Sequence, residues 1–258
     1  MSSIQKAKKY TYQDFWDMRG KQSMWLTQNV SYRLGAYVAL WAAKLKVSPN
    51  MISLMSGLIT VLTTLAVFYI GHSNPWSGVL LILGLQLGYV FDCADGPLAR
   101  VTGQGSSFGI LMDKTSDLGS GMVFPCIMAF AAEHYYCPYV IGRPDYTLRI
   151  LLCMLFIKVT LSVWMWLKEL VVYQADRTME DPRTHGLWWR LKKAVGIYID
   201  EPVYRLGIAI AWIVGWFWEF IMLYSIGVFI IIIVYVLSSK KEMDAMDRKS
   251  SYLLKGGE

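Results

Sequence analysis

Apolar segments recur along the chain from about residue 49 to residue 238, and short polar stretches separate most of them. An α-helix needs roughly 20 predominantly apolar residues to cross a bilayer. The pattern therefore predicts an all-α integral membrane protein with six transmembrane helices. We place these helices at about residues 49–71, 75–96, 107–132, 148–174, 202–217 and 220–238.

The first 48 residues show a different pattern. Residues 1–28 are polar with scattered aromatic side chains, and in residues 29–46 the apolar groups are broken by Arg33, Lys44 and Lys46. Such a stretch is typical of an N-terminal amphipathic helix lying on the membrane surface, although a first spanning helix stays open as an alternative. We therefore expect three parts: a lead-in with this surface helix (1–48), a six-helix domain (49–238) and a cytoplasmic tail (239–258).

Local signals mark the ends of the early helices. Ser48 can cap a helix that begins at Pro49, because serine accepts a bond from a free backbone N–H and proline suits the first turn. Pro97 removes a backbone donor near the end of the second segment, so we expect that helix to bend or stop there. A glycine-containing turn at residues 101–107 then leads into the third segment.

Charge favours a membrane protein over a nucleic-acid-binding one. The 258 residues are 55% hydrophobic and 17% charged, with a net charge of +6. With six spans, nearly every Lys and Arg falls on one side, the exceptions being Arg143, Arg149 and Lys158. Positive residues favour the cytoplasmic side. We therefore expect a multi-pass protein of a bacterial or archaeal cell membrane, with both termini and the active site in the cytoplasm, the bilayer as a partner and no nucleic acid.

Four carboxylates stand at the ends of the second and third apolar segments, where burial near a bilayer makes each one costly. Asp92 and Asp95 are three residues apart, and Asp113 and Asp117 are four apart, so each pair shares one face of a helix. Facing pairs of oxygen ligands suit Mg²⁺ or Mn²⁺. An ion-paired helix end is the alternative, but Arg100 and Lys114 cannot match all four acids.

The spacing of these residues resembles that of the CDP-alcohol phosphotransferase family. The family pattern is D-x2-D-G-x2-A-R-x8-G-x3-D-x3-D, and all eight fixed positions match. They are Asp92, Asp95, Gly96, Ala99, Arg100, Gly109, Asp113 and Asp117. The motif covers about a tenth of the chain, whereas the hydropathy pattern described above covers nearly all of it.

The resemblance implies two divalent metal ions, Mg²⁺ or Mn²⁺, held by Asp92, Asp95, Asp113 and Asp117. It also implies that Asp117 is the general base toward the acceptor hydroxyl, although the sequence alone does not separate a base from a ligand. Such a metal pair can neutralise a diphosphate and hold the attacking and leaving oxygens in line. A possible homodimer is a further implication.

The small residues of the motif also have a direct structural interpretation. Gly96, Ala99 and Gly109 leave room for a flat base and a diphosphate to approach the backbone, and Arg100 can bind phosphate oxygens in bidentate fashion. In the family these positions form the pocket for the CDP donor. Thr102 and Ser107 are further candidates for that pocket, with turn and cap residues as the alternative.

Three cationic side chains are candidates for binding the acceptor. Lys158 lies inside the fourth segment and could face a polar cavity, whereas pairing with a carbonyl or another helix is the alternative. Lys168 and Arg205 lie near the cytoplasmic ends of the fourth and fifth segments, so a negatively charged acceptor could dock between them, with snorkelling toward lipid headgroups as the alternative. Gln86 could line the same cavity.

The resemblance implies a membrane enzyme that moves a substituted phosphate from a CDP-linked donor to an acceptor hydroxyl with release of CMP, in phospholipid biosynthesis. We expect CDP-diacylglycerol as the donor and a small polar alcohol as the acceptor. Transfer of a headgroup from CDP-choline or CDP-ethanolamine to diacylglycerol is an alternative that the motif does not exclude. A six-span cation or proton transporter is a remote alternative, since intramembrane acids also occur in such proteins.

Overall fold

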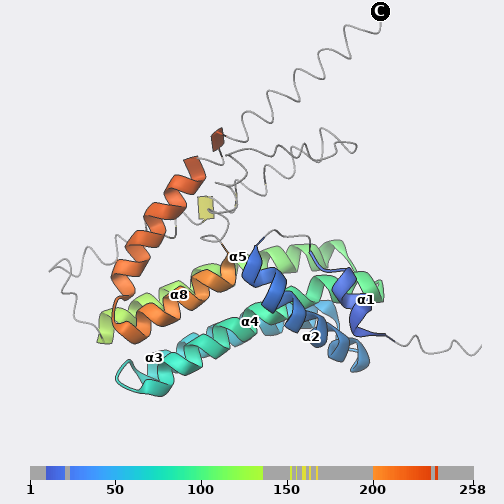
Figure 1. The fold of residues 1–258 in the computed structure, drawn as a ribbon, viewed down its shortest axis with the longest axis horizontal. Helices are drawn as coiled ribbons and strands as arrows, with labels where there is room; N and C mark the ends of the chain where they lie inside the picture. Colours follow the sequence, from blue (N-terminus) through green and yellow to red (C-terminus); the bar gives the residue numbers. More distant parts are fainter. Residues whose placement is uncertain are drawn as a thin grey trace, which may run out of the picture. The chain divides into compact units, whose positions relative to one another are not determined.

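A computed structural model describes residues 10–20, 24–135 and 200–233, with isolated helical positions between 152 and 167 and at 236–237. Within these ranges the chain forms helices and turns, and there is no strand (Figure 1). The described residues up to Phe217 belong to one compact unit, apart from the isolated positions at 152–167. The helix that follows, Phe217–Ile233, falls almost entirely in a second unit. The candidate site lies in the first unit.

The N-terminal part contains more structure than the sequence predicted. A short helix, α1 (Tyr12–Asp17), precedes a π-helical turn, η1 (Thr27–Ser31), and the helix α2 (Tyr32–Lys44). Threonine and aspartate form a reciprocal capping box at the start of α1, in which Asp14 Oδ2 accepts from the Thr11 N–H at 2.7 Å. The polar lead-in expected at residues 1–28 is therefore helical in part, and α2 covers most of the expected surface helix.

The next two helices are close to the predicted ones. Helix α3 runs Pro49–Ile70 and α4 runs Pro75–Thr102. The predicted start of α3 is confirmed, because Ser48 caps it and Pro49 occupies its first turn. Asn74 caps α4 by accepting from the Trp76 N–H at 3.0 Å. Among the described residues, α3 and α4 are the helices long and apolar enough to cross a membrane by length and composition.

Pro97 does not end α4, contrary to one of the two outcomes expected from the sequence. The helix continues to Thr102 and ends at Gly103, which takes a left-handed conformation with φ of 71°. A left-handed residue is the common way to end a helix, and glycine adopts it without a Cβ penalty. The turn expected at residues 101–107 is therefore confined to Gly103–Ser106.

Helices α3 and α4 pack closely because α4 presents glycines to hydroxyl side chains of α3. A Cβ at Gly84 would lie under 3.0 Å from three atoms of Thr63, and a Cβ at Gly88 would meet the Thr60 hydroxyl. Small residues at helix contacts let two backbones approach, which is a common arrangement in membrane proteins. The buried polar side chains of α3, at Ser53, Ser56, Thr60, Thr63 and Thr64, therefore face α4 or its neighbours rather than lipid.

The later helices of the first unit are α5 (Ser107–Tyr135), which follows α4 after a short turn, and α8 (Glu201–Val214). Helix α8 ends earlier than expected, because Gly215 adopts a left-handed conformation with φ of 85° and a new helix starts at Phe217. The predicted boundary between the fifth and sixth segments was therefore wrong by about three residues. The prediction of six spans is neither confirmed nor contradicted by the described ranges.

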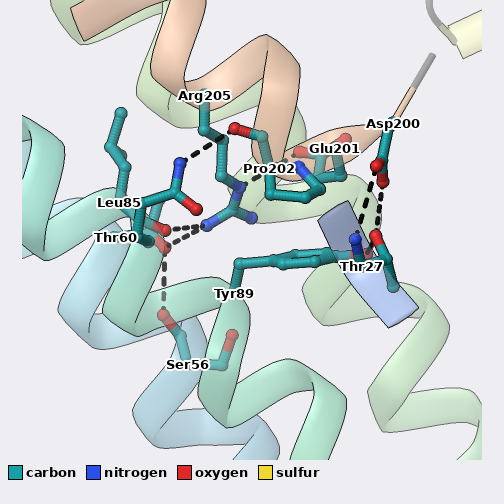
Figure 2. A network of polar contacts seen from close by, with 10 residues as sticks. Thr27, Ser56, Thr60, Leu85, Tyr89, Asp200, Glu201, Pro202 and Arg205 are labelled. Carbon is teal, nitrogen blue, oxygen red and sulfur yellow. Dashed lines mark hydrogen bonds and ion pairs between the residues drawn. The ribbon is translucent and has the colours of Figure 1, made fainter. Parts of the chain in front are cut away.

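A buried arginine joins α8 to α3 and α4 (Figure 2). Arg205 donates through one terminal nitrogen to the Thr60 hydroxyl at 3.2 Å and to the Leu85 carbonyl at 3.0 Å. Its Nε pairs with Glu201 at 3.2 Å. The guanidinium carbon also lies 5.4 Å from the centre of the Tyr89 ring, within cation–π range. These bonds compensate the cost of burying the charge, as a buried ion requires.

The same network reaches the N-terminal part through Asp200, which precedes α8. The Asp200 carboxylate accepts from the Thr27 hydroxyl and, at 3.4 Å, from the Thr27 N–H, while the Thr27 hydroxyl lies 3.1 Å from the Tyr89 hydroxyl (Figure 2). Burial raises the pKa of Asp200 above its usual value, although the bonds from Thr27 act in the opposite direction. Burial likewise raises the pKa of Tyr32, at the start of α2, to about 12.

Candidate active site

Three of the four motif aspartates come together in the structure. Asp92 and Asp95 lie near the end of α4, and Asp113 lies in the second turn of α5. One carboxylate oxygen from each can be chosen so that all three lie within 4.8 Å of one another. Asp95 is buried, and the other two are half-buried. The short turn between α4 and α5 thus brings acids from two helices to one place, as the spacing predicted.

A pocket of about 480 Å³ opens beside these acids. It lies where the first turns of α3, the end of α4 and the start of α5 converge. Its walls include most of the residues expected to bind the nucleotide. The lining comprises Pro49, Asn50, Ser53, Asp95, Gly96, Ala99, Arg100, Gln104, Gly105, Ser106, Gly109, Ile110 and Asp113.

Asp95 is held by the neighbouring helix. The Ser53 hydroxyl, buried on α3, donates to the Asp95 carboxylate, and Ser53 itself lines the pocket. A hydrogen bond to a carboxylate fixes which oxygen remains available to a ligand, as partners of metal-binding carboxylates generally do. Ser53 was not predicted from the sequence, although it belongs to the row of Ser and Thr residues at helical spacing that marks the buried face of α3.

Arg100 forms part of the pocket wall. Its Nε donates to the Met18 carbonyl at 2.8 Å, beyond the end of α1. Its two terminal nitrogens lie against Gly96, where a Cβ would be 3.1 and 3.3 Å from them. The absence of a side chain at Gly96 therefore makes room for the guanidinium of Arg100.

Gly109 also permits a close approach. A Cβ there would lie 3.0 Å from the Asn50 side-chain oxygen, and the Gly109 N–H donates to the Ser106 hydroxyl at 2.9 Å. Asn50 and Ser106 both line the pocket, and neither was predicted. The helix-start signal at residues 48–50 located the first turn of α3 correctly, but that signal carries no information about which helix end lies opposite.

Thr102 is not among the described residues that line the pocket. The Thr102 hydroxyl donates to the Leu98 carbonyl at 2.6 Å, four residues earlier in α4, so in the structure it binds the backbone of its own helix. Ser107 is the first residue of α5, and its side chain lies outside the described part of the chain.

Asp117 follows Asp113 by one turn of α5. Its side chain and that of Lys114 are outside the described part, so the general-base role stays a prediction. The acceptor candidates Lys158 and Lys168 also lie outside the described residues.

Arg205 and Gln86 lie in the polar network between α3, α4 and α8 rather than in the pocket wall. The Arg205 contacts described above include two helices and Glu201. Gln86 donates to the Pro202 carbonyl at 2.8 Å. These bonds give both side chains a structural role. The predicted acceptor role of Arg205 stays a prediction.

The acidic cluster fits a divalent metal on chemical grounds. Its ligands are carboxylate oxygens, which Mg²⁺ and Mn²⁺ prefer, and they come from two different helices around one position. Three carboxylates within 4.8 Å also create a strong negative potential beside a pocket that contains an arginine. Asp92, Asp95 and Asp113 would therefore hold a metal, and Arg100 would complement an anionic ligand.

A helical membrane protein with carboxylates and an arginine converging on one pocket has the features of a phosphoryl-transfer enzyme acting at a membrane. Comparison with known families specifies the class further. A match to the CDP-alcohol phosphatidyltransferase family spans residues 46–238, and the chain belongs to this family. Family membership indicates a membrane-embedded enzyme of lipid biosynthesis.

Individual relatives match over shorter stretches. The chain is 36% identical over 102 residues to a phosphatidylinositol phosphate synthase of Corynebacterium glutamicum, covering 39% of this chain and 44% of that protein. It is 28% identical over 130 residues to a phosphatidylinositol phosphate synthase of Mycolicibacterium smegmatis, covering 50% and 54%. An archaetidylinositol phosphate synthase of Pyrococcus horikoshii is 37% identical over 75 residues, covering 29% and 37%. The matches thus span about half, or less, of these curated relatives.

Proposed function

We propose that this protein transfers a phosphatidyl group from CDP-diacylglycerol to the hydroxyl of a small polar acceptor, with release of CMP. The observation that carries the proposal is the convergence of Asp92, Asp95 and Asp113 beside a pocket walled by Gly96 and Arg100. The pocket combines oxygen ligands for a cation with a cationic side chain for phosphate. A diphosphate that carries a nucleotide needs both.

Each pocket residue has a separate role in this proposal. Gly96, Ala99 and Gly109 keep the pocket open to the nucleotide, and Arg100 binds phosphate oxygens of the donor. Divalent metal ions held by the aspartates would neutralise charge on the diphosphate. Ser53 keeps the Asp95 carboxylate in its orientation. The helix ends thereby orient the donor before an acceptor arrives.

The transfer itself conserves atoms and charge without a further reactant. The acceptor hydroxyl oxygen forms a bond to the phosphorus that carries diacylglycerol. The bond between that phosphorus and the oxygen bridging to CMP breaks, and CMP leaves with the bond electrons. Asp117 accepts the proton of the hydroxyl, a role that rests on the family motif and on its place one turn beyond Asp113.

The names of the relatives favour an inositol phosphate as the acceptor. Three of the four matching relatives are named phosphatidylinositol phosphate synthases and one is named an archaetidylinositol phosphate synthase. An acceptor with a phosphate of its own would be anionic. The cationic side chains predicted for the acceptor, Lys158, Lys168 and Arg205, have the charge that such a molecule needs.

The test offers purified protein CDP-diacylglycerol with inositol phosphate, inositol, glycerol phosphate or serine, in the presence of Mg²⁺ or Mn²⁺. We expect CMP release and one new phospholipid, identified by mass spectrometry. Asp117→Asn should remain folded and inserted but lose nearly all CMP release, because the proton acceptor is lost while the volume is kept. Glu219→Gln, a change of equal size outside the pocket lining, is the matched control and should keep wild-type turnover.

Three results would count against the proposal. Wild-type turnover in Asp117→Asn would refute the general-base assignment. CMP release from CDP-choline with diacylglycerol, and none from CDP-diacylglycerol, would assign the lipid to the acceptor instead. Substrate flux into liposomes without CMP release would favour a transporter.

A further inference from the structure

The short N-terminal helix α1 is fixed against the end of α4 that carries the pocket. Phe15, at the centre of α1, is fully buried in a cluster with Ala36 and Ala39 of α2 and with Ala94 and Leu98 of α4. A helix of this length does not form alone in water, because starting a helix costs more free energy than its few hydrogen bonds recover. The burial of Phe15 therefore holds α1 in place.

Several contacts order the chain immediately after α1. Arg19 lies over the Trp16 ring, with its guanidinium carbon 3.8 Å from the ring centre, and donates to the Trp16 carbonyl at 2.8 Å. Gln28 accepts from the Arg19 Nε at 3.3 Å and donates to the Gly20 carbonyl at 3.1 Å. The turn that contains Met18 is thus held from both sides. We refer to residues 10–20 as the N-terminal clasp.

The clasp meets the pocket at a polar contact with Arg100. Arg100 Nε donates to the Met18 carbonyl at 2.8 Å, whereas its terminal nitrogens face Gly96. Arg100 is otherwise an exposed side chain with several rotatable bonds, whose ordering carries an entropic cost. Because the Met18 carbonyl accepts its hydrogen bond from Nε, the two terminal nitrogens of Arg100 take no part in that bond and point along the pocket wall.

We propose that the N-terminal clasp positions Arg100 for the donor diphosphate, with Phe15 as the anchor and the Met18 carbonyl as the contact. This inference rests on the proposed function, because it takes Arg100 as a ligand of a CDP-linked donor. Phe15 is a positioning residue, since it acts through Arg100 and does not reach the pocket. A clasp that is loosened leaves the pocket intact but lets the guanidinium sample other rotamers.

The test measures CDP binding by calorimetry and the KM for CDP-diacylglycerol in wild type, Phe15→Ala, Arg100→Ala and the double variant. Ordering one long side chain changes affinity by about 3- to 10-fold. We expect Phe15→Ala to weaken CDP binding and raise the donor KM by that factor, with kcat nearly unchanged. In the Arg100→Ala background, Phe15→Ala should have no further effect on CDP binding. Leu62→Ala, an exposed change in α3 outside the clasp and the pocket lining, should match wild type.

Thr11→Ala provides a second perturbation if Phe15→Ala does not fold. It removes the exposed cap of α1 without touching the core, and it should weaken CDP binding in the same direction by a smaller factor. An equal loss from Phe15→Ala with and without Arg100 would overturn the proposal, because the effect would then be structural. Unchanged CDP binding in Phe15→Ala would also overturn it. A wild-type protein that binds no CDP would instead refute the proposed function, and the clasp proposal with it.

Discussion

Replacing one acid of the cluster should separate metal binding from folding. Asp113 is the most informative position because it is the described acid that α5 contributes, whereas Asp92 and Asp95 both come from α4. Asp113→Asn keeps the size of the side chain and removes one negative charge. We expect this variant to fold, and to lose most of the stabilisation that a divalent metal gives the wild-type protein.

The size of the effect follows from the spacing of the acids. A cation held by these three oxygens lies within 4.8 Å of each of them, and at that distance two opposite unit charges attract by about 3.5 kcal/mol at an effective dielectric constant of about 20, before compensation by neighbouring groups. A change of this order in the attraction for a cation corresponds to about 100-fold or more in affinity. Metal at a concentration of about 100 times its Kd stabilises a protein by about 2.7 kcal/mol. After a 100-fold loss of affinity, the same concentration stabilises by only about 0.4 kcal/mol.

The assay is thermal unfolding of the detergent-solubilised protein, with and without Mn²⁺ or Mg²⁺ and after treatment with a chelator. At about 2–4 °C per kcal/mol, metal should raise the wild-type Tm by about 5–10 °C and the Asp113→Asn Tm by about 1–2 °C. Asp17→Asn removes an acid outside the cluster and should keep the wild-type response. An equal metal-dependent rise in Asp113→Asn and in wild type would refute the assignment of the cluster as a metal site.

Two further predictions concern packing and pH. Gly84→Ala should lower the Tm by several degrees, because the new methyl group would meet both branches of Thr63 and overpacking costs about 1–3 kcal/mol. Gly105→Ala is the control, because its methyl group would meet nothing within 4 Å. An equal Tm for the two variants would contradict the packing argument. Burial raises the pKa of Asp200 above 3.8, so its contribution to stability is full below pH 3.8 and is lost as the pH rises through the folded-state pKa. The Tm of wild type minus that of Asp200→Asn should therefore fall as the pH rises from about 3.5 to 7.5, and a difference that stays constant would exclude this linkage.

The first membrane helices and the acidic cluster could be predicted because their signals are local. Ser48, Pro49 and the apolar run behind them define α3, and the glycine turn after α4 defines the start of α5. Once two helices are joined by a short turn, residues near the turn must lie close together. The meeting of Asp92 and Asp95 with Asp113 follows from that geometry.

The part of the pocket lining that α3 contributes could not be predicted in the same way. Ser53 is 42 residues from Asp95, and Asn50 is 59 residues from Gly109, and no local rule states which helix ends pack together. A signal existed in the row of Ser and Thr residues on α3, which is unusual on an apolar helix. That row marks a face turned away from lipid, but it does not identify Asp95 as the partner.

The clasp was missed because its sequence is polar and its stability is tertiary. The capping box at Thr11 and Asp14 is visible in the sequence, yet a helix of six residues is not predicted from a cap alone. Phe15 is the residue that decides the outcome, since its burial against α2 and α4 compensates the cost of ordering α1. The same dependence on partners applies to Arg205, whose burial could not be inferred from its place near a predicted helix end.

Helix α4 continues past Pro97, and α2 packs closely beside the carbonyl that this proline leaves without a helical donor. Proline leaves the Cys93 carbonyl without its helical donor, and Gly35 of α2 packs against that carbonyl at a distance that a Cβ would make tight. Because the helix continues to Thr102, Gly96 and Arg100 lie one turn apart on the same face, and side chains of a helix lean toward its N-terminus. Arg100 therefore folds back over Gly96 into the pocket wall. A helix ending at Pro97 would have placed the same arginine in a loop, so the four-residue spacing within the motif has its structural meaning only because α4 continues.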